Sequence, residues 1–340
     1  MGKATPHLKT ISKTLLGIIL LFYVFNSKMV DFASLKLILY NPTHLLVAFS
    51  FLSFSILCCC LRWFLIIRIQ KLSQSFPSII SLTLIGNFFN TFMPGSVGGD
   101  LIKAWYIAGR EPEKRTRAVF SVLIDRVLGL GVIVCYSAVT LLFFTQWLKG
   151  NSQLQITAVV VWIFSSSCLL FSLCFFWPSF WRFSIVNKGL ALLHKKRRIG
   201  EITDSIMTFK DQFPTVAASI LLSIFSVLGT ILFNIYLGNL LNINLTYAQY
   251  FFIIPLALTA SAIPLLPGGL GTGQVAFFTL FKWMGAPNPE LGATLCTLLQ
   301  VYTILFNCSG AICYLKSKRK GTPTSSKETF SNFSSPTPCL

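Results

Sequence analysis

Long apolar runs separated by short charged loops make up most of the chain. A transmembrane helix needs about 20 mostly apolar residues. Runs that reach or approach this length lie at 14–26, 44–67, 117–146, 155–177, 214–241 and 290–315. The first run follows a basic start, as a signal peptide would, but no small-residue cleavage site follows it, so we expect a retained span. The pattern predicts an all-α integral membrane protein with about six transmembrane helices.

Two further apolar stretches, 77–108 and 247–285, are each interrupted near the middle by proline and glycine. With six spans, both flanks of the first stretch face the cytoplasm and both flanks of the second face the other side. Each stretch is therefore predicted to enter and leave by one face, as a re-entrant hairpin of two half-helices. Unwound backbone at membrane depth requires protein or a watery cavity around it.

The two interruptions resemble each other. "PGSVGGD" at 94–100 matches "PGGLGTGQ" at 267–274 as Pro-Gly, any residue, an aliphatic residue and Gly. With opposite orientations the two stretches would form an inverted repeat, and matching interrupted segments in two halves of a transporter often mark its central site. The match is short and proline with glycine recurs in many loops, so a chance similarity is the alternative.

Composition and charge support the membrane assignment. The chain is 54% hydrophobic and 11% charged, with a mean hydropathy of +0.71, whereas soluble domains carry about a quarter charged residues. The net charge of +18 arises largely from basic clusters in short loops, at 68–71, 110–117, 182–198 and 316–320. The positive-inside rule places these loops and both termini in the cytoplasm. No basic face alternates with exposed aromatic residues, so we expect no nucleic-acid partner.

Two acidic residues lie in or beside the apolar segments: Asp100, and Asp125 next to Arg126. A charge at the centre of a membrane helix costs about 2.5–3.5 kcal/mol on insertion scales, so it normally faces a cavity or a partner. Lys103 lies three residues after Asp100, on the same helix face. Either Arg126 pairs with Asp100, or Arg126 and Lys103 together hold an anionic group. The alternative is a structural ion pair that locks the hairpin to its neighbouring helix.

Amides and glycines complete the candidate lipid pathway. One helix face leading into the first break carries Asn87, Asn90, Thr91 and Pro94. The amides on this face could bond headgroups or ions, or satisfy backbone groups that the proline leaves free. Asn234 and Gln274 are the candidates of the second half. Glycines permit positive φ angles and close backbone approach, and leave N–H groups for an anionic phosphate; those at the breaks are Gly95, Gly98, Gly99, Gly268, Gly269, Gly271 and Gly273.

Catalytic and metal-binding patterns are sparse. The three histidines lie in tails or loops, the ten cysteines form no metal-ligand spacing, and "GGLGTG" at 268–273 follows no strand. We therefore expect no metal, no cofactor and no catalytic residue; a hydrolytic or transfer reaction would have to use Asp100 or Asp125. Residues 321–340 are rich in Ser, Thr and Pro and are predicted to be a disordered tail.

The motifs "GNFFNTFMPGSVGGDLIKAWYI", "DRVLGL" and "IPLLPGGLGTGQVAFFTLF", in this order and spacing, resemble the lysylphosphatidylglycerol synthase transmembrane family, a flippase-like domain. The resemblance covers about residues 10–315. It implies a polytopic protein of a bacterial or archaeal membrane, most simply the bacterial inner membrane, that moves a lipid between leaflets. Motif residues carried over by the resemblance are Pro94, Gly95, Gly98, Asp100, Pro267, Gly268, Gly269 and Gly271.

The resemblance also sets expectations about activity. In the namesake proteins a separate soluble domain attaches lysine to phosphatidylglycerol, and no such domain stands in this sequence, so we expect a stand-alone member rather than an aminoacyltransferase. Many family members have a glutamate where this chain has Gln274, which argues against a proton-coupled role for the second half. Stand-alone members are linked with several lipid and lipid-linked sugar pathways, so the resemblance leaves the substrate open.

The predicted organisation is a cytoplasmic segment at 1–13, a flippase-like transmembrane domain at 14–315 and a basic, then disordered, tail at 316–340. The predicted function is translocation of an anionic phospholipid or a lipid-linked glycan between leaflets. The alternatives are an accessory or assembly factor that binds a lipid-modifying enzyme or glycosyltransferase, and a membrane enzyme acting on lipid-linked sugar or aminoacyl-lipid. The sequence is compatible with a homo-oligomer.

Overall fold

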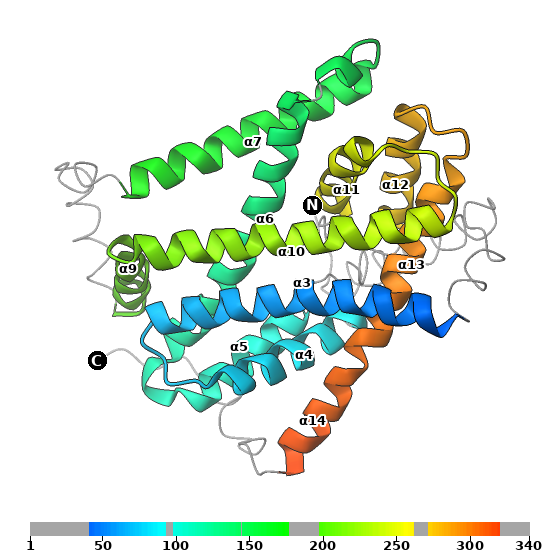
Figure 1. The fold of residues 1–340 in the computed structure, drawn as a ribbon. Helices are drawn as coiled ribbons and strands as arrows, with labels where there is room; N and C mark the ends of the chain where they lie inside the picture. Colours follow the sequence, from blue (N-terminus) through cyan, green and yellow to red (C-terminus); the bar gives the residue numbers. More distant parts are fainter. Residues whose placement is uncertain (1–40, 93–97, 144, 177–196, 262–270, 320–340) are drawn as a thin grey trace, which may run out of the picture.

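The computed structural model describes residues 41–92, 98–143, 145–176, 197–261 and 271–319, and these are built from helices (Figure 1). Five of the predicted spans are confirmed as helices long and apolar enough to cross a membrane. They are α3 (Pro42–Ile69), α6 (Arg115–Phe143), α7 (Ser152–Phe176), α10 (Phe213–Leu240) and α13 (Glu290–Asn307), the last continued by α14 (Ser309–Arg319). The first predicted span, 14–26, and the tail at 321–340 lie outside the described residues.

Shorter helices occupy the two interrupted stretches and the loop before α10. The first stretch forms α4 and α5, the second forms α11 and α12, and α9 precedes α10. Their bounds are α4 (Phe76–Phe92), α5 (Gly98–Arg110), α9 (Arg197–Lys210), α11 (Tyr247–Ser261) and α12 (Thr272–Trp283), with the short 3-10 turns η1 (Pro112–Lys114) and η2 (Thr145–Leu148). The described residues thus give an all-α, multi-pass membrane protein, as predicted.

Helices α3 and α10 run antiparallel through the middle of the molecule (Figure 1). The side chains of His44 and Tyr236 lie 2.9 Å apart near one end of the pair, and the Ser55 and Ser226 hydroxyls lie 2.9 Å apart near its middle. Gly229 lies against α3, because a Cβ there would fall 2.9 Å from the Phe54 ring. Small residues at the contact let two membrane helices approach closely without a hydrophobic driving force.

Helices α4 and α5 form an antiparallel hairpin. At the tip, the Gly99 N–H donates to Asn90 Oδ1 at 2.7 Å, and at the open end Arg110 bonds the Ser78 hydroxyl. The side chain of Glu111, directly after α5, accepts from the backbone N–H of Ser73, in the turn before α4, at 2.9 Å. Both flanks of the hairpin therefore lie at one end, as a re-entrant segment requires. The connection itself, with Pro94 and Gly95, lies outside the described residues.

The second hairpin, α11 and α12, packs at the opposite end of α6. The first hairpin contacts the N-terminal part of α6, where Ala118 and Val122 are buried. The second contacts its C-terminal part, where the Ser137 and Thr259 hydroxyls lie 3.3 Å apart. Opposite ends of one spanning helix lie toward opposite faces of the membrane, so this packing fits the prediction that the two hairpins enter from opposite sides. Its connection, with Pro267, Gly268 and Gly269, lies outside the described residues.

The two halves share a common register. Helices α3 and α10 are both 28 residues long and start 171 positions apart. The starts of α4 and α11 are separated by the same offset. So are the positive-φ residues that follow the two long helices, Lys71 (φ 55°) and Asn242 (φ 52°). The two helix ends also make matching backbone hydrogen bonds. The Leu72 N–H donates to the Ile67 carbonyl, and the Ile243 N–H donates to the Gly238 carbonyl. This is the bond pattern of a Schellman helix end, and its repetition supports the inverted repeat.

Gly99→Ala tests the packing at the tip of the first hairpin. A Cβ at this position would fall 1.9 Å from the Gly86 carbonyl oxygen, so the two half-helices must separate. We expect the substitution to lower the free energy of unfolding by about 1–3 kcal/mol, measured as heat-induced loss of the monodisperse protein in detergent.

The matched control is Gly131→Ala, in the middle of α6, where nothing lies within 4 Å of the added Cβ. Its helix gains about 0.5–1 kcal/mol of propensity. Equal heat stability of the two variants would contradict the close approach of α4 and α5.

Candidate functional site

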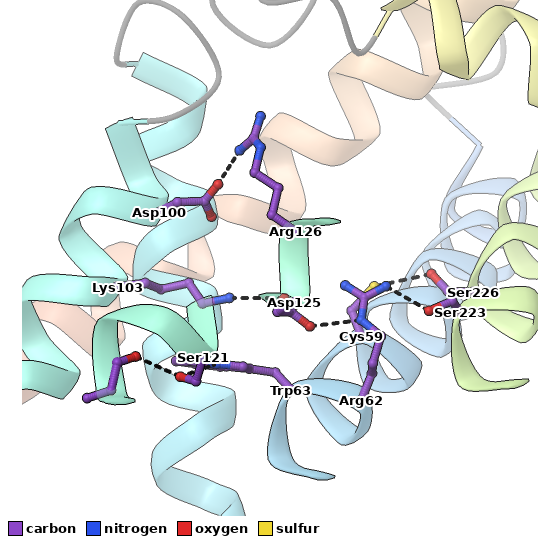
Figure 2. Close-up of polar contacts among 11 residues, drawn as sticks. Cys59, Arg62, Trp63, Asp100, Lys103, Ser121, Asp125, Arg126, Ser223 and Ser226 are labelled. Atoms are coloured by element: carbon purple, nitrogen blue, oxygen red, sulfur yellow. Dashed lines mark hydrogen bonds and ion pairs between the residues drawn. The ribbon is translucent and has the colours of Figure 1, made fainter. Parts of the chain in front are cut away.

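A cluster of ion pairs lies where α3, α5 and α6 meet (Figure 2). Arg62 Nε of α3 donates to Asp125 Oδ1 of α6 at 2.8 Å, and Lys103 Nζ of α5 lies 3.7 Å from Asp125 Oδ2. The three side chains are only 7–11% exposed. Burying a charge is tolerated when it is paired and hydrogen-bonded, and here one carboxylate serves two cations from two other helices.

The Arg62 guanidinium fits because α6 has no side chain at the next turn. Its Nη1 donates to the Ser223 hydroxyl of α10 at 3.0 Å. Gly129 lies four residues after Asp125 on α6, and a Cβ there would fall 2.9 Å from Nη1. A single arginine therefore ties α3 to both α6 and α10.

Lys103 lies between an aromatic ring and a glycine. Its Nζ is 3.9 Å from the centroid of the Trp63 ring, a cation–π distance. The Trp63 indole N–H donates to the Ser121 hydroxyl at 3.3 Å, which fixes the plane of the ring. The aliphatic stem of Lys103 passes over Gly86, where a Cβ would fall 2.8 Å from the lysine Cγ and Cδ.

Asp100 and Arg126 form a second ion pair, at the N-terminal end of α5 (Figure 2). This pairing is one of the arrangements that the sequence suggested. Asp100 lies in the first turn of α5, where the helix dipole favours a negative charge. The pair is more accessible than the Asp125 cluster, with 21% of the Asp100 and 28% of the Arg126 side chain exposed. Together the two clusters hold three cations and two carboxylates, a net charge of +1.

The polar residues of the first break bond the backbone and a neighbouring helix. Asn90 accepts the Gly99 N–H, which matches the expectation that an amide would satisfy a backbone group at the break. The backbone carbonyl of Asn87 accepts from the Thr91 hydroxyl, and that hydroxyl in turn accepts from Asn307 Nδ2 of α13 at 3.0 Å. Gly98 is the first residue of α5.

In the second half, Gln274 is buried at the start of α12. Its Oε1 accepts the Gly271 N–H at 2.7 Å, and its Nε2 donates to Gln300 Oε1 of α13 at 2.6 Å. Gly271 has φ 77°, the left-handed conformation that favours glycine. Asn234 lies elsewhere, fully buried on α10, where its Nδ2 donates to the Thr230 carbonyl. The structure brings together Asp100, Lys103, Asp125 and Arg126, but it gives Asn234 no contact with Gln274.

The sequence reasoning missed Arg62, Trp63, Ser223 and Gln300. The signal for Arg62 was present, because it is a lone charge inside the apolar run "CCCLRWFLII", and such a charge usually marks a buried partner. The other three carry no comparable signal, since tryptophan, serine and glutamine are ordinary in membrane helices. In the described part of the chain, no group of three or more His, Cys, Asp and Glu side chains could hold a metal ion.

Asp125→Ala tests whether the central carboxylate holds the three helices together. Removing it leaves the Arg62 and Lys103 cations buried with no other carboxylate bridging them. Loss of one partner of a buried pair costs about 3–5 kcal/mol, so we expect a large fall in heat stability of the detergent-purified protein. Asp211→Ala, at an exposed turn after α9, removes the same charge and should change stability little. Similar heat stability of both variants would show that Asp125 does not hold the three helices together.

Comparisons with known proteins agree with this architecture. Residues 11–308 match the family model described as the lysylphosphatidylglycerol synthase TM region. A UPF0104 membrane protein of Methanocaldococcus jannaschii is 25% identical over 308 residues, which cover 82% of this chain and 86% of the relative. A UPF0104 membrane protein of Pyrococcus horikoshii is 25% identical over 271 residues, which cover 71% of this chain and 77% of the relative. No solved structure matches.

Both relatives come from archaea, so the bacterial membrane stays a prediction, as do the cytoplasmic termini. The family match spans all five candidate membrane helices almost completely and both hairpins. The chain belongs to the lysylphosphatidylglycerol synthase TM region family.

Proposed function

We propose that this protein moves a lipid with an anionic headgroup from one membrane leaflet to the other, past the tip of the α4–α5 hairpin. The observation that carries the proposal is the Asp100–Arg126 ion pair, which lies partly accessible at the broken end of a half-helix. Charged residues at membrane depth usually face a cavity or a transported ion. Here the second cation, Lys103, follows one helical turn away.

An anionic headgroup can use cations that are already paired. A phosphate approaching Arg126 competes with the Asp100 carboxylate, and both anions offer the guanidinium similar bidentate hydrogen bonds. Exchange of one anion for the other therefore costs far less than moving the phosphate into hydrocarbon alone. Because the two clusters carry a net charge of +1, one added negative charge is neutralised rather than repelled.

The acyl chains need not enter the protein. On the same two helices as the ion pair, α5 exposes Leu101 and Trp105, and α6 exposes Leu123 and Val127. In a membrane protein these large apolar side chains face lipid tails. A lipid could therefore pass with its headgroup at the polar tip of the hairpin and its tails in the bilayer, which removes the largest cost of burial.

The Asp125 cluster has a supporting role in this proposal. Its side chains are less exposed than the Asp100–Arg126 pair and they tie α5 to α3 and α6. We assign Asp125 and Arg62 to positioning the hairpin, and Arg126, with Lys103 behind it, to contact with the headgroup. An accessory factor that only binds a lipid-modifying enzyme would need the ion pairs for stability alone.

Proteoliposomes test the proposal. We expect the purified full-length protein to move fluorescent phosphatidylglycerol between leaflets, measured by dithionite quenching of the outer leaflet. Arg126→Ala should slow this movement about 10- to 100-fold, since a charge-assisted hydrogen bond contributes about 1.5–3 kcal/mol. Asp100→Asn should also slow it, because the neutral side chain no longer exchanges with the phosphate.

The control is Lys149→Ala, which removes an exposed cation far from the hairpin in sequence. It should leave transport unchanged. Expression and heat stability of every variant are measured in parallel, so that a folding defect is recognised. Movement that is absent in the unmodified protein for phosphatidylglycerol, for other acidic phospholipids and for polyprenyl-phosphate sugars would exclude the translocase and favour the accessory factor.

A further inference from the structure

A cavity of about 490 Å³ opens at the turn between α3 and α4, away from the two ion-pair clusters. It is lined by Arg68, Lys71 and the residues from Leu72 to Ser75. Its volume falls in the usual range of small-molecule sites, about 300–1,000 Å³. Because α3 is long enough to cross the membrane and ends at Ile69, this turn lies near the level of the lipid headgroups.

Two cations at this cavity have no acidic partner. The Arg68 guanidinium lies over the Phe64 ring, 4.9 Å from its centroid, which holds the charge without using its N–H groups. Within the described ranges, neither Arg68 nor Lys71 forms an ion pair or a side-chain hydrogen bond with another residue. The same holds there for the hydroxyls of Ser73 and Ser75. The cavity therefore presents two charged and two neutral donors.

Glu111 and Lys114 fix the walls of the cavity. One oxygen of Glu111 accepts from the Ser73 N–H at 2.9 Å and from Gln74 Nε2 at 2.7 Å. Lys114 Nζ donates to the Lys71 carbonyl at 2.7 Å. Together with the two lining cations, these residues give three cations and one carboxylate, a net charge of +2. The surroundings thus favour an anion.

The equivalent turn in the second half shows that the backbone does not require these cations. Lys71 has φ 55°, a conformation that asparagine adopts more readily than lysine. At the matching positions, 171 residues along the chain, the second half has Asn239 and Asn242, the latter with φ 52°. The same turn can therefore form with two neutral side chains.

We infer that this cavity is a phosphate-binding site, which takes the phosphate group of a membrane lipid or of a soluble compound. Arginine, lysine and serine side chains are donors to phosphate oxygens. Helix α4 begins at Phe76, directly after the cavity, and its first turn carries no acidic side chain, so the helix dipole also favours an anion there. The positive-inside rule accounts for basic residues at this end of the molecule, but it requires no cavity between them.

The site is separate from the proposed lipid pathway. It lies at the open end of the α4–α5 hairpin, whereas the Asp100–Arg126 pair lies at the tip. The 17 residues of α4 separate the two by roughly 25 Å. A phosphate group can therefore bind here whether or not the protein moves lipids.

Titration of the purified full-length protein in neutral detergent tests the inference. Dioctanoyl-phosphatidylglycerol and inorganic phosphate are added separately, and binding is measured by calorimetry. Every protein carries Arg126→Ala, so that the hairpin tip does not contribute. Arg68→Asn combined with Lys71→Asn copies the turn of the second half and should keep the heat stability of its parent. We expect this double variant to bind about 10- to 30-fold more weakly, since each cation near a membrane surface contributes about a factor of five.

The matched control is Lys149→Asn combined with Lys282→Asn, which removes two exposed cations elsewhere and gives the same net charge. It should keep the affinity of its parent. Weaker binding of the lipid, of inorganic phosphate or of both by the double variant alone supports the site and identifies the source of the phosphate. No binding of either ligand, or equal affinities of the double variant and the control, would overturn the inference. If the double variant does not fold, Lys71→Gly, which also suits a positive φ, replaces it.

Discussion

The first half of the structure depends on the ion pairs of the Asp125 carboxylate. It is buried in a spanning helix and holds Arg62 of α3 at 2.8 Å and Lys103 of α5 at 3.7 Å. Because an unpaired charge at this depth is costly, the three helices can meet only in the arrangement that pairs all three groups. Gly86 and Gly129 leave the space that the two cationic side chains occupy. The half-helix α5 is thereby fixed, and with it the position of Asp100 and Arg126.

The two halves of the chain repeat one arrangement of helices. Long helix, hairpin and long helix recur in the same order, and the first long helices, α3 and α10, match in length, helix end and positive-φ residue. The two hairpins pack at opposite ends of α6. In transporters, such an arrangement puts broken helix ends near the middle of the membrane from both sides, which is the usual place of the transport site. The polar contacts then differ between halves, with ion pairs at α5 and amides at α12. The two halves thus share an arrangement of helices but differ in their polar contacts.

Much of this could be predicted from the sequence, since it depends on local pattern. Apolar length predicted the spans, and Pro-Gly breaks between flanks of equal orientation predicted the hairpins, whose helices α4, α5, α11 and α12 lie where expected. The Asp100–Arg126 pair was also among the sequence hypotheses. Lys103 was a candidate there too, and its contact with Asp125 fits the alternative of an ion pair that locks the hairpin to its neighbouring helix. Arg62 was not predicted as a partner of Asp125, because that contact depends on how α3 is rotated against α6, which no periodicity specifies. Gln300 carries no signal of its own, since glutamine is ordinary in membrane helices, and its contact with Gln274 appears only once α12 packs on α13.

The central claim is that the two hairpins enter the membrane from opposite faces and each returns to its own face. Four exposed positions flank the hairpins: Ser75 and Glu113 flank the first, and Asn244 and Asn288 flank the second. Each is replaced by a single cysteine. Each new cysteine is introduced into a variant whose ten native cysteines are replaced. It is then labelled with a membrane-impermeant maleimide in vesicles of known orientation. The account predicts that Ser75→Cys and Glu113→Cys label from one side and that Asn244→Cys and Asn288→Cys label from the other. Labelling of the two flanks of either hairpin from different sides would contradict it.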